Sequence, residues 1–316
     1  MTGHNGETQP SIFQNKSSGF NNSFIVLFVL NIFLAITATL GNTLIFLALG
    51  GGNSCLHGPS RLLIRSLAFI DLCVGLISQP LAALHAVSIL TKHLAIFQFT
   101  VVSSYIISAI LSGVSLFILT IISIDRLLAL SLGVRYRQTV TIQRVRTLVI
   151  LIWTVNIANA TIRFLGKRFA FYMVCLAGIF LCVVVSTLCY GKICCTLRVR
   201  RKKVRGTVFQ GQLNESSQLQ VERYKKTVSS ALWVHFTLLA CYLPYSIVSG
   251  LKAITGDSYA VAEGFTATLV FFNSSVNPVL YCWRIREVRQ AVKQTIRQYR
   301  GLSNGAQNEM TEETPC

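Results

Sequence analysis

Polar side chains that are able to bind a cation lie inside otherwise apolar segments of this sequence. Asn42, Asp71, Ser115 and Asn273 each lie ten or eleven residues from the inner end of their segment. At about 1.5 Å per helical residue, each would be about 15 to 16 Å deep in a bilayer core about 30 Å thick. Burying a carboxylate at that depth is costly, so we favour one hydrated cluster around Asp71. Separate hydrogen bonds to neighbouring helices are the alternative.

A second group of residues suggests movement rather than binding. Asp125 and Arg126 are adjacent at the expected inner end of the third segment, where they are able to pair, although boundary residues that snorkel would look the same. Pro244 and Pro278 lie inside the sixth and seventh segments. Each proline removes one helical hydrogen bond and permits a kink, so each marks a candidate hinge.

Enzyme chemistry has no support in the sequence. It contains no HExxH, CxxC, GxSxG or P-loop pattern. Only His85 and His235 lie within the apolar segments, which is too few for a catalytic zinc site with three protein ligands. We therefore expect no enzyme activity and no cofactor apart from an ion at Asp71.

Seven apolar segments must position these residues. Charged residues make up 13% of the chain, against about 25% in soluble domains, and hydrophobic residues make up 52%. The sequence predicts an all-α membrane protein with seven spans near residues 24–50, 62–90, 95–125, 145–165, 169–198, 226–250 and 260–283.

The basic residues predict how the chain lies in the membrane. With the N-terminus outside, 23 of the 29 Lys and Arg residues fall on the inner side. The net charge of +18 thus reflects topology, and no nucleic-acid partner is expected. Asn15 and Asn21 begin glycosylation sequons on the outer side. The plasma membrane is the expected location.

Three parts are expected along the chain: an outer tail over 1–22, the membrane domain over 23–283, and an inner tail over 284–316. Residues 199–225 are expected to form a solvated inner loop. An amphipathic helix is predicted at about 285–299 from the stripe of Ile285, Val288, Val292 and Ile296, followed by a disordered end over 301–316. Palmitoylation of Cys194, Cys195 or Cys282 stays open.

An ordered series of motifs resembles the class A, or rhodopsin-like, G-protein-coupled receptors, from about residue 24 to 299. Gly41-Asn42 resembles the first-span GN motif, and Leu67–Asp71 resembles LAxxD. Asp125–Leu127 resembles DRY without its tyrosine. The remaining matches are Trp153 in span four, Tyr190 in span five, Cys241–Pro244 for CWxP and Asn277–Tyr281 for NPxxY.

The resemblance implies a two-state receptor that binds an outer ligand and then a heterotrimeric G protein; arrestin binding is left open. It implies oxygen donors to sodium beside Asp71 at Ser115, Asn273, Ser274 and Asn277. It also implies an activation switch and a ligand pocket. The switch would comprise Asp125, Arg126, Tyr190, Tyr242, Pro244, Asn277, Pro278 and Tyr281, and the pocket Tyr105, Ser108, Ser112, Tyr245, Ser249 and Glu263.

Departures from the family pattern narrow the expected ligand. Val101 stands where the family usually has a disulfide cysteine, and Ser108 stands where amine receptors have an aspartate. No lysine in 258–283 is available for covalently bound retinal. A biogenic amine and retinal are both disfavoured, and the ligand stays unknown. A seven-span transporter of a small solute is the alternative function, although no internal repeat supports it.

One further departure concerns the resting state. Many members of the family pair the DRY arginine with an acid twenty residues before the CWxP proline. That position is Tyr224 here, and the nearest acid is Glu222. The sequence therefore predicts elevated basal signalling.

Overall fold

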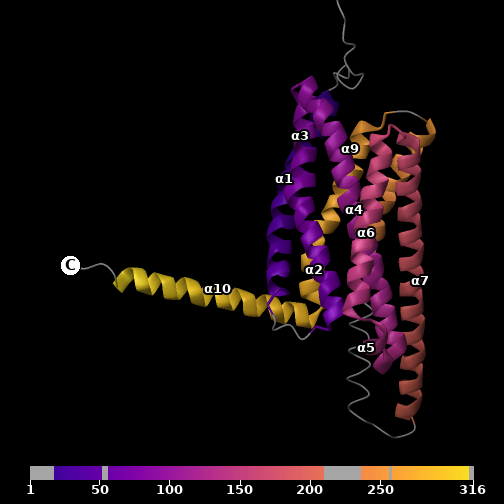
Figure 1. Cartoon of the computed structure of the whole chain (residues 1–316), viewed down its shortest axis with the longest axis vertical. Helices are drawn as coiled ribbons and strands as arrows, with labels where there is room; N and C mark the ends of the chain where they lie inside the picture. The colour runs from indigo at the N-terminus through magenta and orange to yellow at the C-terminus, as the bar shows by residue number, and fades with distance from the viewer. Residues whose placement is uncertain (1–17, 52–55, 210–235, 256–257, 313–316) are drawn as a thin grey trace, which may run out of the picture.

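The computed structural model describes residues 18–51, 56–209, 236–255 and 258–312. These residues are almost entirely helical and include no strand. The long helices stand side by side, and α10 projects from one end of the bundle (Figure 1). The predicted all-α, seven-transmembrane bundle is confirmed.

The first three spans contain four labelled helices and one irregular turn. They are α1 (Ser18–Ala48), α2 (Gly58–Cys73), the π-helical turn η2 (Val74–Ser78), α3 (Gln79–Leu90) and α4 (Leu94–Leu132). Helix α1 starts at Ser18 and so includes part of the expected tail over 1–22. In η2 the Gln79 N–H donates to the Val74 carbonyl, and Pro80, which has no N–H, follows. The second span therefore runs as one helix from Gly58 to Leu90, but its backbone hydrogen bonds change from the α to the π pattern within η2.

The rest of the described chain supplies the other four spans, two short helices and the long helix α10. These are η3 (Gly133–Arg135), α5 (Tyr136–Thr139), α6 (Ile142–Phe164), α7 (Arg168–Phe209), an unlabelled helix over Phe236–Thr255, α9 (Ala260–Arg284) and α10 (Arg286–Glu312). The turn from α6 to α7 is short, and its Gly166 has φ +76°, a conformation that side chains with a Cβ disfavour. The expected start of the sixth span at 226 lies outside the described residues.

Six helices among the described residues are long and apolar enough to cross a membrane, and α9 is not one of them. Asn273, Ser274 and Asn277 lie in its middle and reduce its mean hydropathy. Helix α9 nevertheless packs against α1 and α2. Its polar residues therefore face protein, and it completes the seven-helix bundle.

Two expectations at the inner end were wrong. Helix α7 continues to Phe209, so residues 199–209 are helical and not loop; its Arg and Lys residues are good helix formers, and proline is absent there. Helix α10 extends to Glu312, well past the predicted end near 299, so residues 301–312 are not disordered. Val288 and Val292 are buried near the start of α10, which leads away from the bundle (Figure 1).

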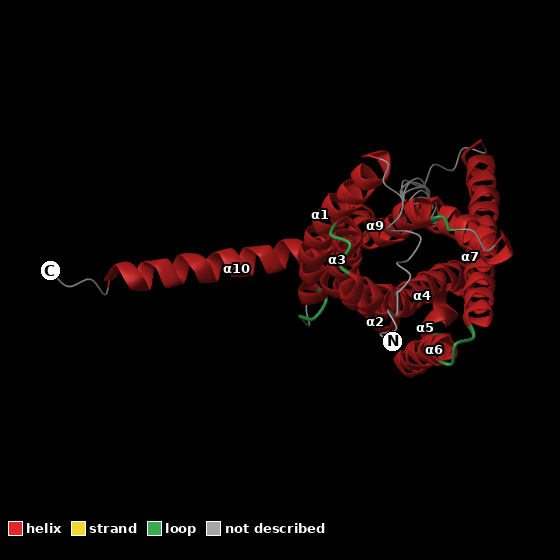
Figure 2. Ribbon diagram, turned by 90° about the horizontal axis from the view of Figure 1, so that it is seen from above, coloured by secondary structure: helices red, strands yellow, loops and turns green. Residues whose placement is uncertain are grey.

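Helix α4 occupies the centre of the packing. It contacts α2, α3, α6 and α7, and the view from above shows it between α2 and α7 (Figure 2). Leu111, Val114, Ile118 and Leu119 of this helix are buried in the main apolar core. Many large apolar side chains on the outward faces of the helices are exposed, such as Phe33, Ile150 and Phe180. That pattern suits a bundle surrounded by lipid.

Candidate functional site

The inner end of the bundle holds the Asp125 and Arg126 pair. Arg126 Nε lies 3.9 Å from Asp125 Oδ2, which is an ion pair without a hydrogen bond. Asp125 instead accepts hydrogen bonds from Tyr136 Oη at 2.5 Å and from Ser60 Oγ at 2.9 Å. Burial and the neighbouring Asp125 raise the pKa of Tyr136 to about 12, so its hydroxyl remains a donor at neutral pH. Asp125 is thus tied mainly to α2 and α5.

Two other residues of the predicted switch, Tyr190 and Tyr281, are buried at the same end of the bundle as Arg126. Ser123 Oγ donates to Tyr190 Oη at 2.9 Å, joining α4 to α7. Tyr281 Oη and Arg126 Nη2 are buried, and neither has a hydrogen-bond partner within the part of the chain that the structure describes. Unsatisfied buried polar atoms are costly, so this end of the bundle has donors available for a different arrangement.

The middle of the bundle holds the Asp71 cluster. Asp71 is fully buried, and its Oδ1 accepts from Ser274 Oγ at 2.8 Å and from Ser115 Oγ at 3.3 Å. Asn277 Nδ2 donates to Oδ2 at 2.7 Å. Three helices, α2, α4 and α9, therefore meet at one carboxylate.

Two predicted members of this cluster lie outside the direct shell of Asp71. Asn42 Nδ2 donates to the carbonyls of Ala38 and Ser274, each at 2.9 Å, so it reaches Asp71 only through Ser274. Asn273 is buried, and its Nδ2 has no hydrogen-bond partner among the described residues. Equal depth placed these residues at one level, but the direction of each side chain decided which of them touch Asp71.

Helix α1 approaches α9 closely at the same level. A Cβ on Gly41 would lie 3.0 Å from Pro278 Cγ. Pro278 itself lies inside the continuous helix α9. The glycine of the predicted GN motif thus makes room for the proline of the predicted NPxxY motif.

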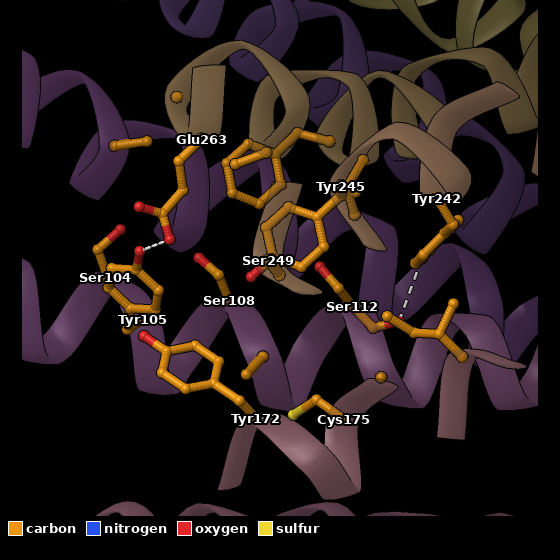
Figure 3. A pocket seen from close by; sticks show the side chains of 18 of the residues that line it. Ser104, Tyr105, Ser108, Ser112, Tyr172, Cys175, Tyr242, Tyr245, Ser249 and Glu263 are labelled. Carbon is orange, nitrogen blue, oxygen red and sulfur yellow. Dashed lines mark hydrogen bonds between the residues drawn. The ribbon is translucent and has the colours of Figure 1, made fainter. Parts of the chain in front are cut away.

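The opposite half of the bundle contains a cavity of about 640 Å³, within the usual range for small-molecule sites. Its lining is mainly apolar and comes from all seven spans. All six predicted pocket residues line it: Tyr105, Ser108, Ser112, Tyr245, Ser249 and Glu263 (Figure 3).

One charged pair and several hydroxyl groups mark the cavity. Lys252 Nζ lies 2.6 Å from Glu263 Oε2, and the Tyr105 hydroxyl donates to Glu263 Oε1. At the other end of the cavity, Tyr242 Oη donates to the backbone carbonyl of Ser112 at 3.2 Å (Figure 3). Ser108 Oγ is buried and has no hydrogen-bond partner in the described residues.

The sequence interpretation missed Lys252 and Tyr136. It counted Lys252 only as an outer basic residue, although an acid eleven residues further on, across the turn between the last two spans, was a usable signal. Tyr136 lies eleven residues after Asp125 and contacts it because the chain turns back through η3 and α5. No residue pattern that the sequence analysis used indicates that the chain turns back toward Asp125 there.

Val101 stands where the family usually has the cysteine of a disulfide to the second outer loop. Val101 lines the cavity, and all eight cysteines among the described residues are free. Cys194 is half-buried and Cys195 is exposed on α7, and Cys282 is half-buried near the end of α9.

A bundle of seven helices, with a cavity in one half and a buried aspartate paired with a half-buried arginine at the other end, is the architecture of a membrane receptor. The chain belongs to the family described as 7 transmembrane receptor (rhodopsin family), whose model matches residues 41–170 and 165–281. It is therefore a multi-pass membrane protein and a G-protein-coupled receptor, and nothing in the comparisons favours a transporter.

Individual relatives include receptors for different ligands. The histamine H2 receptor of Canis lupus familiaris is 28% identical over 304 residues, which cover 88% of this chain and 81% of the relative. Trace amine-associated receptor 9 of Mus musculus is 24% identical over 288 residues, covering 82% and 81%. Adenosine receptor A2a of Homo sapiens is 26% identical over 302 residues, covering 84% and 71%.

Proposed function

We propose that this receptor binds a small extracellular ligand in the 640 Å³ cavity and transmits binding to a heterotrimeric G protein at the Arg126 end. The observation that carries the proposal is that α4 contributes to both sites. Tyr105 lines the cavity and Arg126 lies 21 residues further along the same helix, about 32 Å away. A ligand that favours one arrangement of the helices at the cavity thereby biases the other end.

The moving element in this proposal is the helix over Phe236–Thr255. Tyr242 connects it to α4 through the Ser112 carbonyl, and Lys252 connects it to α9. Pro244 lies between these two contacts and supplies a hinge. An outward swing of the inner end would expose Arg126, Tyr190 and Tyr281 to the G protein, and arrestin is a second partner of the same opened surface.

The ligand in this proposal is neither a biogenic amine nor covalently bound retinal. Two relatives are named for histamine and trace amines, but this chain has Ser108 where the amine-receptor pattern places an acid. Helix α9 contains no lysine to form a Schiff base. The acid and the lysine that anchor these two ligand classes are therefore missing at the positions where the family has them.

The location and the ion follow from the same proposal. The receptor lies in the plasma membrane with its N-terminus outside, as the distribution of Lys and Arg favours. Asp71 binds an allosteric sodium ion in the resting state. The donor set suits sodium because the Ser115 and Ser274 hydroxyl oxygens both lie within 3.3 Å of Asp71 Oδ1.

Nucleotide exchange on purified G proteins tests the function. Receptor in lipid nanodiscs is mixed with Gs, Gi and Gq in turn, and binding of a non-hydrolysable GTP analogue is followed. We expect exchange above that of empty nanodiscs without any ligand, because Tyr224 replaces the usual acid of the resting lock; Tyr224 and Glu222 lie outside the described residues.

The tested variant and its control each replace one basic residue by alanine. Arg126→Ala is expected to reduce exchange by about tenfold or more, since it removes a group buried at the inner end. Lys167→Ala, at an exposed position in the α6–α7 turn, is expected to leave exchange unchanged. Exchange no faster than in empty nanodiscs with all three G proteins would contradict basal coupling, and an unaffected Arg126→Ala would contradict the assigned interface.

A further inference from the structure

Lys252, Glu263 and Tyr105 form one polar cluster at the outer end of the cavity. Lys252 Nζ lies 2.6 Å from Glu263 Oε2 and donates to Tyr105 Oη at 3.1 Å. It also lies 5.3 Å from the centre of the Tyr105 ring, in the range of a cation–π contact. The cluster joins the helix over Phe236–Thr255 to α9 and α4, and all three side chains line the cavity.

Lys252 therefore already neutralises the charge of Glu263, the acid in the cavity. Lys252 and Glu263 are the only Lys, Arg, Asp or Glu residues in the described lining, so the lining carries no net charge from them. The Glu263 side chain is 13% exposed and that of Lys252 is 30% exposed, so the pair is poorly screened by water. A cationic ligand would have to displace an ammonium group that stays tethered beside it. Like charges at that distance repel, and a displaced Lys252 would lose its counterion.

The same cluster leaves acceptor capacity for an uncharged donor. An ionised carboxylate offers about four lone-pair sites, and Glu263 uses its two oxygens for one contact each, with Lys252 and Tyr105. Ser108 Oγ, one helical turn along α4 from Tyr105, is buried in the cavity and has no hydrogen-bond partner among the residues that the structure describes. A neutral group with an N–H or O–H is thus able to bind Glu263 while a second polar group reaches Ser108.

We propose that Lys252 is a tethered cation that fills the cation subsite of the cavity, so that the receptor selects uncharged ligands that donate an N–H or O–H to Glu263. This inference rests on the proposed function, in which the cavity is the ligand site. Lys252 is a specificity-determining residue in this proposal. Its removal opens the subsite to an ammonium ligand.

A matched pair of probes tests the proposal without knowledge of the natural ligand. 2-Phenylethylamine and 2-phenylethanol share a ring and a two-carbon chain, and at pH 7.4 they end in an ammonium and a hydroxyl. Dissociation constants are measured by ligand-observed NMR with receptor in nanodiscs, and empty nanodiscs are subtracted to remove partitioning into lipid. The wild type is expected to bind the alcohol at least as tightly as the amine.

Three variants separate the charge of Lys252 from its bulk. Lys252→Met keeps the length of the side chain and is expected to shift the affinity ratio toward the amine by about tenfold or more. Lys252→Arg keeps the cation and is expected to retain the wild-type ratio. The double variant Lys252→Met/Glu263→Gln lacks both charges and is expected to lose the shift toward the amine. Thermal unfolding of each variant checks that it is folded.

Several results would overturn the proposal. A wild type that prefers the amine by about tenfold would show that the subsite is open. Folded Lys252→Met that binds the amine no better than the wild type, or does not bind it, would show that Lys252 occupies no cation subsite. If the shift in affinity toward the amine persists in the double variant, the ammonium group of the ligand binds at a site other than Glu263. None of these readouts includes a G protein, so they are independent of the nucleotide-exchange test.

Discussion

At the scale of single residues, the three acids within the described spans of this receptor are satisfied in three different ways. Asp71 is surrounded by neutral hydroxyl and amide donors. Asp125 is held by Tyr136 and Ser60, and Glu263 by Lys252 and Tyr105. A buried carboxylate without a cation nearby favours the binding of one, because neutral donors offset only part of the free-energy cost of its desolvation. In the proposed function, Asp71 is therefore the acid that recruits an ion from solution.

Sodium is expected to stabilise the resting receptor through Asp71. At a sodium concentration ten times the dissociation constant, the gain is about 1.4 kcal/mol by mass action. The thermal midpoint of the wild type should be higher in sodium chloride than in N-methylglucamine chloride of equal ionic strength. Asp71→Asn should show the same midpoint in both salts.

Glu263→Gln is the control for the sodium experiment. It removes a second buried carboxylate that already has a cation, so the sodium effect should survive in it. If the wild type unfolds at one temperature in both salts, a protonated Asp71 bonded to Asn277 replaces the sodium site.

At the scale of the elements, the π-helical turn η2 in the second span packs closely against α1. The π-helical turn η2 presents Gly75 to α1, and a Cβ there would lie 2.7 Å from Thr39 Oγ1, 3.0 Å from Thr39 N and 3.2 Å from the Ala35 carbonyl oxygen. Two of these atoms belong to the backbone, which is unable to rotate away. The contact between α1 and η2 therefore depends on the absence of a side chain.

Gly75→Ala is expected to destabilise the bundle by about 1–3 kcal/mol, because the added methyl group overpacks the contact with α1. The matched control is Gly178→Ala in α7, where the new Cβ would lie 3.8 Å from Phe117 Cζ, an ordinary contact. Both changes raise helix propensity, so the difference between their thermal midpoints isolates the clash. Equal midpoints for the two variants would show that α1 and η2 are not in tight contact.

At the scale of the whole molecule, the distribution of charge and apolar surface defines how the receptor lies in a bilayer. Apolar side chains are exposed around the bundle, and 23 of 29 basic residues fall on one predicted side. The extended helices α7 and α10 both leave the bundle at that end and carry many of these residues (Figure 1). Basic segments of this kind favour the cytoplasmic leaflet, where anionic lipids gather.

Glycosylation is expected only at the N-terminal end. Asn15 lies outside the described residues, whereas Asn21 is exposed in the first turns of α1 and close to the membrane. Asn159 is half-buried and donates to Cys175 Sγ at 3.2 Å, and Asn273 is buried, so both should stay unmodified. Glycosidase treatment should reduce the mass of the wild type, and less so that of Asn15→Gln. Sugar on Asn214, which also lies outside the described residues, would reverse the orientation.

The spans and the level of the polar groups were predictable from the sequence alone. Apolar runs of sufficient length form helices in a bilayer, and a constant rise per residue converts sequence position into depth. Asp71 and Ser115 were therefore expected at one level, and the ordered motifs identified the family. The local rules did not indicate the six cavity residues; the resemblance to the family implied them, and all six line the cavity.

Only the tertiary structure decided which of these groups touch. Asn273 lies at the predicted depth of Asp71 but does not bond to it, because α9 presents Ser274 and Asn277 to the carboxylate instead. Lys252 meets Glu263 and Tyr136 meets Asp125 because turns and packing bring separate elements together. The rise per residue of a helix determines the depth of a residue, whereas the relative rotation and contact of helices depend on the packing of every side chain between them.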